Sequence, residues 1–468
     1  MEALYLAAGH RSSGKTTVAL GLSAALAERG LAVQPYKKGP DYIDPMWHTR
    51  AAGRGCRNLD FTTQGREEIR AEFGRHLAGA DLGLVEGNTG LFDGTALDGS
   101  NSNAAMAKLL GLPVVLVVDT RGMNRGIAPL LLGYQAFDPD LDLAGVIFNQ
   151  VANGRHESKL REVVEHYTDL QVLGALRRDP SLGIDERHLG LVPSNEAQEV
   201  TDHLGRLARA VAEQVDLEAV RDLARPPATP VGSGRTGGRA DPDVRIGIAR
   251  DAAFSFYYPD DLEALEAGGA ELVPIDTLSD PHLPEVDGLF LGGGFPEVQM
   301  EGLAANASLR ADIRAACESG LPVYAECGGL MYLARRLRWG DREAEMVGFL
   351  PGDAVMAERP QGKGYVLLRD RGTGPWPGEA GNGGVVHAHE FHYSRLDNLE
   401  PGQEFAFQVL RGTGIDGEHD GLVRKNVLAC YTHLRHVASD PWTERFLACV
   451  RARKHSEAPA PALACPHG

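Results

Sequence analysis

The feature that most constrains this chain is a glycine-rich loop near its start, residues 9–16, which reads G-x-x-x-x-G-K-T. An apolar run at residues 3–8 precedes the loop, and residues 18–26 follow it with the apolar pattern of a helix. Strand, glycine loop and helix in this order are typical of a phosphate-binding loop. In such a loop Lys15 reaches the β- and γ-phosphates and the Thr16 hydroxyl binds Mg²⁺. We expect the nucleotide to be bound by Gly9, Ser13, Gly14, Lys15, Thr16 and Thr17.

Three further apolar runs, residues 82–87, 113–119 and 143–149, are continuous rather than alternating. Continuous runs are typical of strands buried on both faces, which predicts a parallel sheet covered by helices. Ligands of such sheets bind at the carboxyl ends of the strands. The runs place Glu86, Asp119 and Asn149 at those ends. Asp119 is therefore a candidate second acid for a magnesium ion.

The predicted domain organisation is α/β throughout. Residues 1–223 form the phosphate-loop domain, and residues 224–243, rich in Pro, Gly and Arg, are expected to be a linker. A second α/β pattern covers residues 244–450, and residues 451–468 are expected to be a disordered tail.

Composition narrows the possible partners. The net charge of −17 argues against binding nucleic acid, because phosphates would be repelled. The six cysteines form no C-x-x-C pair, which argues against a zinc ribbon or a disulfide framework. No stretch approaches the ~20 apolar residues of a membrane span. We expect a cytoplasmic enzyme that binds no membrane.

A second reactive centre is predicted at Cys327. The apolar run 321–325 leads to this cysteine, Gly328 and Gly329 follow it, and then a helix begins. This is the pattern of a nucleophile elbow with sulfur in place of a serine hydroxyl. We expect the turn to expose the thiol and the helix N-terminus to favour the thiolate.

A nucleophilic cysteine requires a base, and His433, at the end of a late apolar strand, is our candidate. The backbone N–H groups of Gly293 and Gly294 are candidates for an oxyanion hole. Each feature alone has an ordinary explanation: a buried cysteine, a histidine at a strand end and a tight turn. Their combination in one α/β domain favours catalysis.

Several motifs resemble known families. Residues 291–297, 324–330 and 431–434 resemble the glutaminase domain of cobalamin-pathway amidotransferases. The segments 37–45, 57–60, 85–87, 90–94 and 389–394 are similar to the cobyrinic acid a,c-diamide synthase family. This resemblance implies a P-loop synthetase domain like that of dethiobiotin synthetase, followed by a class I-type glutaminase domain. It also implies ATP-dependent amidation of a corrinoid, with glutamine as nitrogen donor and Mg²⁺ as cofactor.

The resemblance assigns further roles by position. It places Asp41, Asp44 and Glu86 around Mg²⁺ and the reacting carboxylate. It makes Asn149 a candidate for reading adenine. It leaves Lys37, Lys38 and Asp93 as candidates for binding the tetrapyrrole substrate.

The chain departs from the family pattern in two places. Familiar triad glutaminases carry Glu two residues after the histidine, and here that position is Arg435, which leaves Glu390 as a candidate orienting acid or a Cys–His dyad. Asn88 and Thr89 replace apolar residues, and residues 96–103 are more polar than the family pattern. These changes near the expected substrate site leave room for a different tetrapyrrole.

Alternative functions remain open at this point. The same chemistry on sirohydrochlorin or sirohaem is the nearest alternative. A non-catalytic P-loop switch acting through dimerisation is a second, and the glutaminase domain argues against it. A metal-binding module built on His387, His389 and His392 ranks last. We expect ATP, glutamine and a tetrapyrrole as partners. The sequence leaves the oligomeric state open, with a homodimer as one candidate.

Overall fold

The computed structural model describes residues 1–184, 186–187, 190–191, 197–228, 241–381 and 383–457. The chain divides into two compact units, residues 1–235 and 236–468. The division falls inside the segment predicted as a linker.

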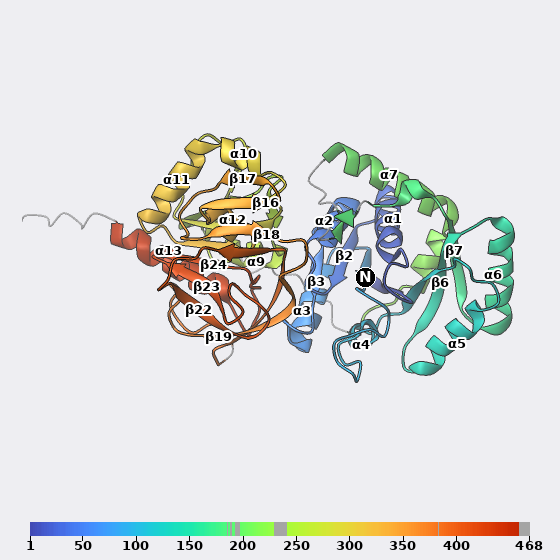
Figure 1. The fold of residues 1–468 in the computed structure, drawn as a ribbon. Coiled ribbons are helices and arrows are strands. Elements are labelled where there is room, and N and C mark those ends of the chain that lie inside the picture. The colour runs from blue at the N-terminus through green and yellow to red at the C-terminus, as the bar shows by residue number, and fades with distance from the viewer. Residues whose placement is uncertain (185, 188–189, 192–196, 229–240, 382, 458–468) are drawn as a thin grey trace, which may run out of the picture. The chain divides into compact units, whose positions relative to one another are not determined.

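The first unit is built on a seven-stranded parallel sheet in the order β3-β2-β4-β1-β5-β6-β7, with helices on both faces (Figure 1). Its strands are β1 (Glu2–Ala8), β2 (Val33–Lys38), β3 (Arg57–Leu59), β4 (Leu82–Glu86), β5 (Val114–Asp119), β6 (Leu143–Val151) and β7 (Gln171–Arg177). Its helices are α1 (Lys15–Glu28), α2 (Ile43–Ala52), α3 (Arg66–Leu77), α4 (Asn103–Leu110), α5 (Ile127–Phe137), α6 (Gly154–Tyr167), α7 (Ala197–Gln214) and α8 (Leu217–Leu223). A 3₁₀ turn, Pro180–Leu182, and the short pair β8 (Glu186–Arg187) and β9 (Gly190–Leu191) complete the unit.

Strand burial explains the continuous apolar runs. Every residue of β2, β4 and β5 is buried, because helices cover both faces of the sheet. The strand order places β4 between β1 and β2. The carboxyl end of β4 therefore lies between the glycine loop that follows β1 and the end of β2.

The second unit is built on a nine-stranded mixed sheet in the order β12-β10-β13-β15-β24-β23-β22-β19-β20. Its strands are β10 (Val244–Ala249), β11 (Phe254–Phe256), β12 (Ala270–Ile275), β13 (Gly288–Leu291), β14 (Gly293–Gly294), β15 (Val323–Glu326), β16 (Arg336–Trp339), β17 (Arg342–Glu345), β18 (Asp353–Met356), β19 (Gly362–Asp370), β20 (Val385–His392), β21 (Ser394–Asp397), β22 (Glu404–Arg411), β23 (His419–Arg424) and β24 (Val427–Cys430). Its helices are α9 (Pro259–Ala267), α10 (Met300–Ala305), α11 (Ala307–Glu318), α12 (Gly328–Leu333) and α13 (Trp442–Glu457). Strands β17-β16-β18-β21 form a separate small sheet, and β11 pairs with β14.

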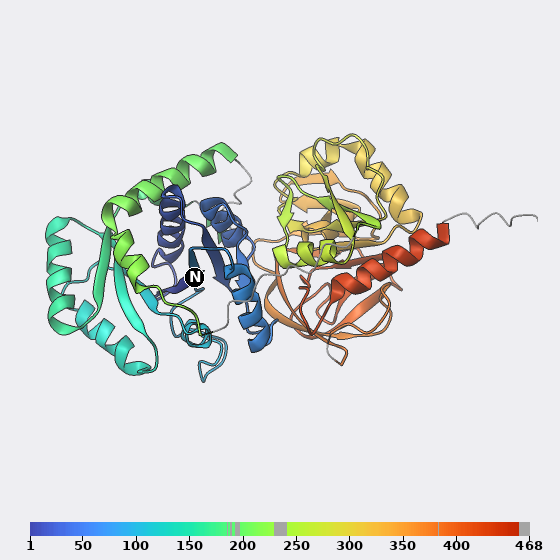
Figure 2. The same cartoon turned by 180° about the vertical axis from the view of Figure 1, so that it is seen from behind.

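Two apolar cores lie on the two faces of the larger sheet. Figures 1 and 2 show the ribbon of this unit from its two sides. Along β15, Val323 and Ala325 belong to one core together with Cys327, whereas Tyr324 belongs to the other. Strand β15 lies between β13 and β24 and runs parallel to both. The segments that follow these three strands therefore meet at one edge of the sheet.

The structure is ordered at the start of the predicted linker and at the start of the predicted tail, where the sequence predicted no ordered structure. Backbone hydrogen bonds join Arg225 to Ala3, so the first residues after α8 pair with β1. Helix α13 continues to Glu457, past the predicted start of a disordered tail at Arg451. In this part of the helix, Arg451 forms an ion pair with Asp243. Residues 229–240 of the linker and 458–468 of the tail lie outside the described residues.

Among the helices that the structure describes, none is long and apolar enough to cross a membrane.

Candidate functional site

The glycine loop connects β1 to α1, as its motif predicts. Gly14 has a φ of 81°, and a Cβ atom added to it would lie 2.0 Å from Asn149 Nδ2. That amide nitrogen donates a hydrogen bond to the Ser13 carbonyl at 2.9 Å. A side chain at position 14 is thus excluded by both conformation and space. Asn149 holds the loop in place, and its proposed contact with adenine stays a prediction.

Glu86, at the end of β4, is the centre of the first site. Its Oε1 accepts hydrogen bonds from Lys15 Nζ, Thr16 Oγ1 and Lys37 Nζ, each at 2.7 Å. Its side chain is fully buried. Burial alone would raise the pKa of Glu86, but the charges of Lys15 and Lys37 outweigh it and hold that pKa well below its usual value. The Glu86 carboxylate is therefore ionised near neutral pH.

His48 is part of the same cluster and was missed in the sequence. Its Nε2 hydrogen-bonds to Glu86 Oε2, and the side chain is buried in α2. The two residues are separated by 38 positions, so no local motif links them. The signal that could have found it is a polar residue on the buried face of a helix that directly follows the 37–45 motif.

Asp41 and Asp44 lie at the start of α2. Asp41 Oδ1 accepts the backbone N–H groups of Ile43 and Asp44, at 2.9 and 3.1 Å. Burial and the neighbouring Asp44 charge raise the pKa of Asp41 to about 6. Asp44 forms an ion pair with Lys37. The structure therefore brings Asp44 and Glu86 to one ammonium group, and it places Asp41 against Asp44.

The groups near Thr16 that would hold a magnesium ion are a hydroxyl and a carboxylate, the oxygen donors that Mg²⁺ prefers. Adjacent oxygen ligands of octahedral Mg²⁺, with bonds of roughly 2.0–2.1 Å, lie about 2.9 Å apart. Thr16 Oγ1 and Glu86 Oε1 are 2.7 Å apart, close to that spacing. Asp119 instead accepts hydrogen bonds from Arg121, including one from Nε to Oδ2 at 2.8 Å. The role of Asp119 in binding the cation stays a prediction.

The two lysines proposed to hold substrate differ in their surroundings. Lys37 is buried, and although burial lowers its pKa, Asp44 and Glu86 together hold that pKa well above its usual value. Its charge is already balanced, so the proposed contact with substrate is not supported by its position. Lys38 Nζ lies 3.4 Å from Asn88 Oδ1, and burial lowers its pKa to about 8. Lys38 remains the better candidate.

The unexpectedly polar segment 96–103 has structural roles. Asn101 Oδ1 accepts the Ala96 N–H at 3.1 Å, and Asn103 is buried with its Nδ2 donating to the Gly90 carbonyl at 2.7 Å. Asp93 Oδ2 accepts the Gly90 N–H at 2.9 Å and closes the same turn. The polarity of this segment therefore shapes the loop and does not by itself indicate a different substrate.

In the second unit, Cys327 lies at a strained turn between β15 and α12. Its φ of 45° and ψ of −92° are unusual for a non-glycine residue. The predicted elbow is present, but the predicted exposure is wrong, because Cys327 is only 7% exposed. Burial raises the pKa of the Cys327 thiol. The resting side chain is therefore a thiol that needs a base.

The glycine cluster and His433 meet this turn. A Cβ atom on Gly293 would lie 2.7 Å from His433 Cε1, and one on Gly328 would lie 3.0 Å from the Gly294 nitrogen. The segments after β13, β15 and β24 thus converge, as the sheet order requires. The backbone of Gly293 and Gly294 lies where an oxyanion hole is predicted, and that role stays a prediction.

His433 is buried, and two further side chains contribute to its environment. Burial and the nearby His392 lower the pKa of His433 to about 3, so its imidazole is neutral. His433 Nδ1 lies 3.3 Å from Glu326 Oε2. The backbone of His433 also donates to the His389 carbonyl at 2.8 Å. Glu326 was missed in the sequence, although it directly precedes the nucleophile.

The candidate orienting acid Glu390 has other partners. Its carboxylate accepts the N–H groups of Thr413 and Gly414 at 2.8 and 2.9 Å, and it lies 3.7 Å from His392 Nε2. These contacts fix the loop after β22, and the acid that contacts His433 is Glu326. The expectation for Glu390 was wrong because a motif does not show which face of β20 the acid occupies.

The alternation of side chains between the two faces of β20 also argues against the alternative of a metal-binding module built on three histidines. His387 and His389 share one face of β20, and His392 points to the other. His392 stacks on Tyr431 with ring centroids 4.0 Å apart. Arg435, at the position of the familiar glutamate, is buried, and its Nη2 donates to Asp260 at 2.8 Å.

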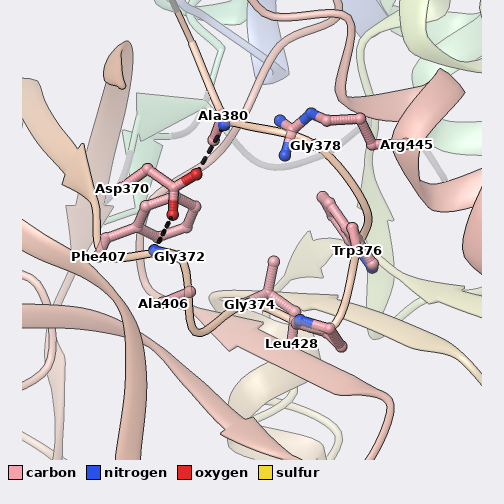
Figure 3. A pocket seen from close by; sticks show the side chains of 11 residues that line it. Asp370, Gly372, Gly374, Trp376, Gly378, Ala380, Ala406, Phe407, Leu428 and Arg445 are labelled. Atoms are coloured by element: carbon pink, nitrogen blue, oxygen red, sulfur yellow. Dashed lines mark hydrogen bonds between the residues drawn. The ribbon is translucent and has the colours of Figure 1, made fainter. Parts of the chain in front are cut away.

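The second unit has a small pocket that is lined by residues of the apolar core containing Tyr324. It does not lie in the core that contains Cys327. Figure 3 shows Asp370 beside it, accepting the N–H groups of Gly372 and Ala380 at 2.8 and 2.7 Å. The Asp370 carboxylate is thus used to hold its own loop.

Comparison with known proteins gives two matches, one in each half of the chain. Residues 4–192 match the model described as the CobQ/CobB/MinD/ParA nucleotide binding domain, and residues 245–441 match that of the CobB/CobQ-like glutamine amidotransferase domain. A protein of Magnetococcus marinus named cobyrinate a,c-diamide synthase is 47% identical over 95% of this chain and 96% of its own length. Proteins of the same name from Archaeoglobus fulgidus and Methanosarcina acetivorans are 43% and 40% identical, over 94% and 93% of this chain and 96% and 92% of theirs.

Proposed function

The chain belongs to the cobyrinate a,c-diamide synthase family, and from this premise we propose that it amidates the a and c acetate side chains of cobyrinic or hydrogenobyrinic acid. It is a glutamine-dependent, amide-forming ligase of cobalamin biosynthesis that uses ATP. The observation that carries the ATP- and glutamine-dependent chemistry is the presence of two different sites in one chain, whereas the corrinoid substrate is supported by the names of the relatives. One gathers Lys15 and Thr16 on Glu86, and the other gathers Cys327 and His433 at one sheet edge.

The first site activates the substrate. A carboxylate is a poor electrophile, so the γ-phosphoryl group of ATP is transferred to it, which gives an acyl phosphate and ADP. Lys15 neutralises charge on the phosphoryl group, and the loop amides hold the phosphates. Thr16 and Glu86 would hold Mg²⁺, which supplies further charge neutralisation. Ammonia then attacks the acyl carbon, the C–O bond to phosphate breaks, and the amide forms as the nitrogen loses a proton.

The second site supplies the ammonia. His433 Nε2 takes the proton of the Cys327 thiol as sulfur attacks the carboxamide carbon of glutamine. The C–N bond breaks, His433 returns the proton to the leaving nitrogen, and a thioester remains. Water then attacks the thioester, the C–S bond breaks, and glutamate leaves. Because burial raises the pKa of Cys327, this proton transfer is an essential part of the first step.

The experiment that tests the substrate compares cobyrinate, hydrogenobyrinate and sirohydrochlorin side by side, with ATP, Mg²⁺ and glutamine, and reads the products by mass spectrometry. The proposal expects two carboxylate-to-amide conversions on a corrinoid and none on sirohydrochlorin. Diamidation of sirohydrochlorin alone would reject the corrinoid assignment and retain the mechanism.

A further inference from the structure

Glu326 and His433 form a buried pair that the mechanism above does not use. The two side chains are almost completely buried, and His433 Nδ1 lies 3.3 Å from Glu326 Oε2. Glu326 is the last residue of β15 and therefore directly precedes the nucleophile at the elbow. The acid, the base and the nucleophile thus come from two neighbouring strands, β15 and β24.

The Glu326 carboxylate is held in one orientation. Its Oε1 accepts hydrogen bonds from the Tyr324 hydroxyl at 2.5 Å and from the Leu434 backbone N–H at 3.1 Å. With Oε1 occupied by two donors, Oε2 is the oxygen that faces His433.

Tyr324 is itself fixed by the surrounding aromatic rings. It stacks on Phe290 with centroids 5.2 Å apart, and it meets Trp442 at 4.7 Å and Trp376 at 5.1 Å. Trp376 is the indole labelled in Figure 3. A rigid aromatic cluster therefore sets the position of the hydroxyl, and the hydroxyl sets the carboxylate.

We propose that Glu326 is the positioning residue for His433 and fixes its imidazole in the tautomer that accepts a proton from Cys327. A carboxylate oxygen at Nδ1 accepts the Nδ1–H bond, which leaves the Nε2 lone pair free for the thiol proton. This inference rests on the proposed glutaminase half-reaction. It assigns the acid whose usual position is taken by Arg435, which is bound to Asp260.

The substitution Glu326→Gln tests this role without changing the volume of the side chain. Tyr324 and Leu434 donate to Oε1, so the carbonyl of the glutamine takes that place and its NH₂ group faces His433. A donor at Nδ1 moves the imidazole proton to Nε2, where it blocks the base. The corresponding carboxylate-to-amide change in serine proteases lowers kcat about 10⁴-fold. We expect a fall in kcat for glutamine hydrolysis of at least roughly 10²-fold, with KM for glutamine little changed.

Two further variants complete the test. Glu326→Asp keeps the acid and should recover part of the lost kcat, whereas a purely packing role would favour the isosteric Gln over Asp. Asp261→Asn is the matched control, because Asp261 is a buried acid that accepts the His436 N–H. Its amide keeps that acceptor, so glutamine hydrolysis should stay at the parental rate.

Glutamine hydrolysis and ammonia-dependent amidation are measured separately in the full chain. Loss of glutamine hydrolysis in Glu326→Gln, with ammonia-dependent amidation retained and partial recovery in Glu326→Asp, supports the proposal. A parental kcat in Glu326→Gln, or an equal loss in Asp261→Asn, overturns it. A parent that hydrolyses glutamine but amidates no tetrapyrrole would reject the proposed substrate and leave the Glu326 result interpretable.

Discussion

Thr16 and Glu86 are 70 residues apart in the chain and share a hydrogen bond of 2.7 Å. The sheet order explains this contact, because β4 lies between β1 and β2 and brings its terminal acid beside the phosphate loop. We propose that the hydroxyl and the carboxylate are oxygen ligands of a magnesium ion on the nucleotide.

The first prediction concerns Lys15. Lys15→Ala should abolish amidation with either glutamine or ammonia, because the transferring phosphoryl group loses its main cation. Glutamine hydrolysis should continue, since Cys327 and His433 belong to the other unit. The comparison is the amidation rate against Lys159→Ala, a change at an exposed lysine of α6. Normal amidation by Lys15→Ala would reject the nucleotide site.

The second prediction concerns the acids around Lys37. Glu86→Gln should lower the amidation rate by on the order of 10²-fold or more, and breaking a buried ion pair should also cost about 3–5 kcal/mol of unfolding free energy. Asp44→Asn should lower the rate with a smaller loss of stability, since Asp44 is partly exposed. Urea unfolding and amidation assays measure both effects. Glutamine hydrolysis that falls in parallel with amidation would contradict the separation into two sites.

The third prediction tests the packing of the glycine cluster. In Gly293→Ala the new methyl group would lie 2.7 Å from His433 Cε1, so the imidazole must shift from its observed position. Glutamine hydrolysis should be lost and ammonia-dependent amidation kept. Gly374→Ala, where the methyl group has space, is the matched control and should retain both. Equal activity of the two variants would show that His433 does not need its observed position.

The sequence predicted those parts of the sites that are encoded locally. The loop from Gly9 to Thr16 and the elbow at Cys327 both lie at strand-to-helix junctions, as their motifs indicate. Glu86 was found because it ends an apolar run. In each case the residues that form the feature are neighbours in the chain.

The residues that were missed or misassigned depend on long-range contacts. His48 reaches Glu86 from α2, and Glu326 reaches His433 from a different strand. The substrate contact proposed for Lys37 stays a prediction, but its ion pairs with two carboxylates were not foreseen. Glu390 was chosen from a motif, but the pleat of β20 turns it toward another loop. These contacts depend on the order of strands in the sheet and on the face to which each side chain points. A local sequence pattern shows neither.

The fourth prediction concerns pH. Burial raises the pKa of Glu326 to about 8 and lowers that of His433 to about 3. Only ionised Glu326 accepts the Nδ1–H bond, so kcat/KM for glutamine hydrolysis should rise as pH increases through about 8. Tyr324, Cys430 and Asp261 also lie near Glu326, and burial raises the pKa of each.

The matched variants separate these groups. The increase of kcat/KM with pH should disappear in Glu326→Gln and remain in Asp261→Asn. The contribution of Glu326 to the free energy of unfolding should change with pH in the direction opposite to kcat/KM. A folded-state pKa above the usual 4.5 means that the stability contributed by protonated Glu326 is complete below pH 4.5 and is lost as pH rises toward 8. An unchanged increase of kcat/KM with pH in Glu326→Gln would assign the titration to another group.

In the proposed mechanism two chemistries in one chain share ammonia as their intermediate, and the substitution Cys327→Ser tests this. A serine hydroxyl is far less acidic than a thiol, so the variant should lose glutamine-dependent amidation. The first unit keeps its own sheet and phosphate loop, so added ammonia should still be used. The measurement is the ammonium-dependent amidation rate of Cys327→Ser against the parent at raised pH. We expect equal rates with glutamine dependence lost, whereas full glutamine-dependent activity in the variant would contradict a shared ammonia intermediate.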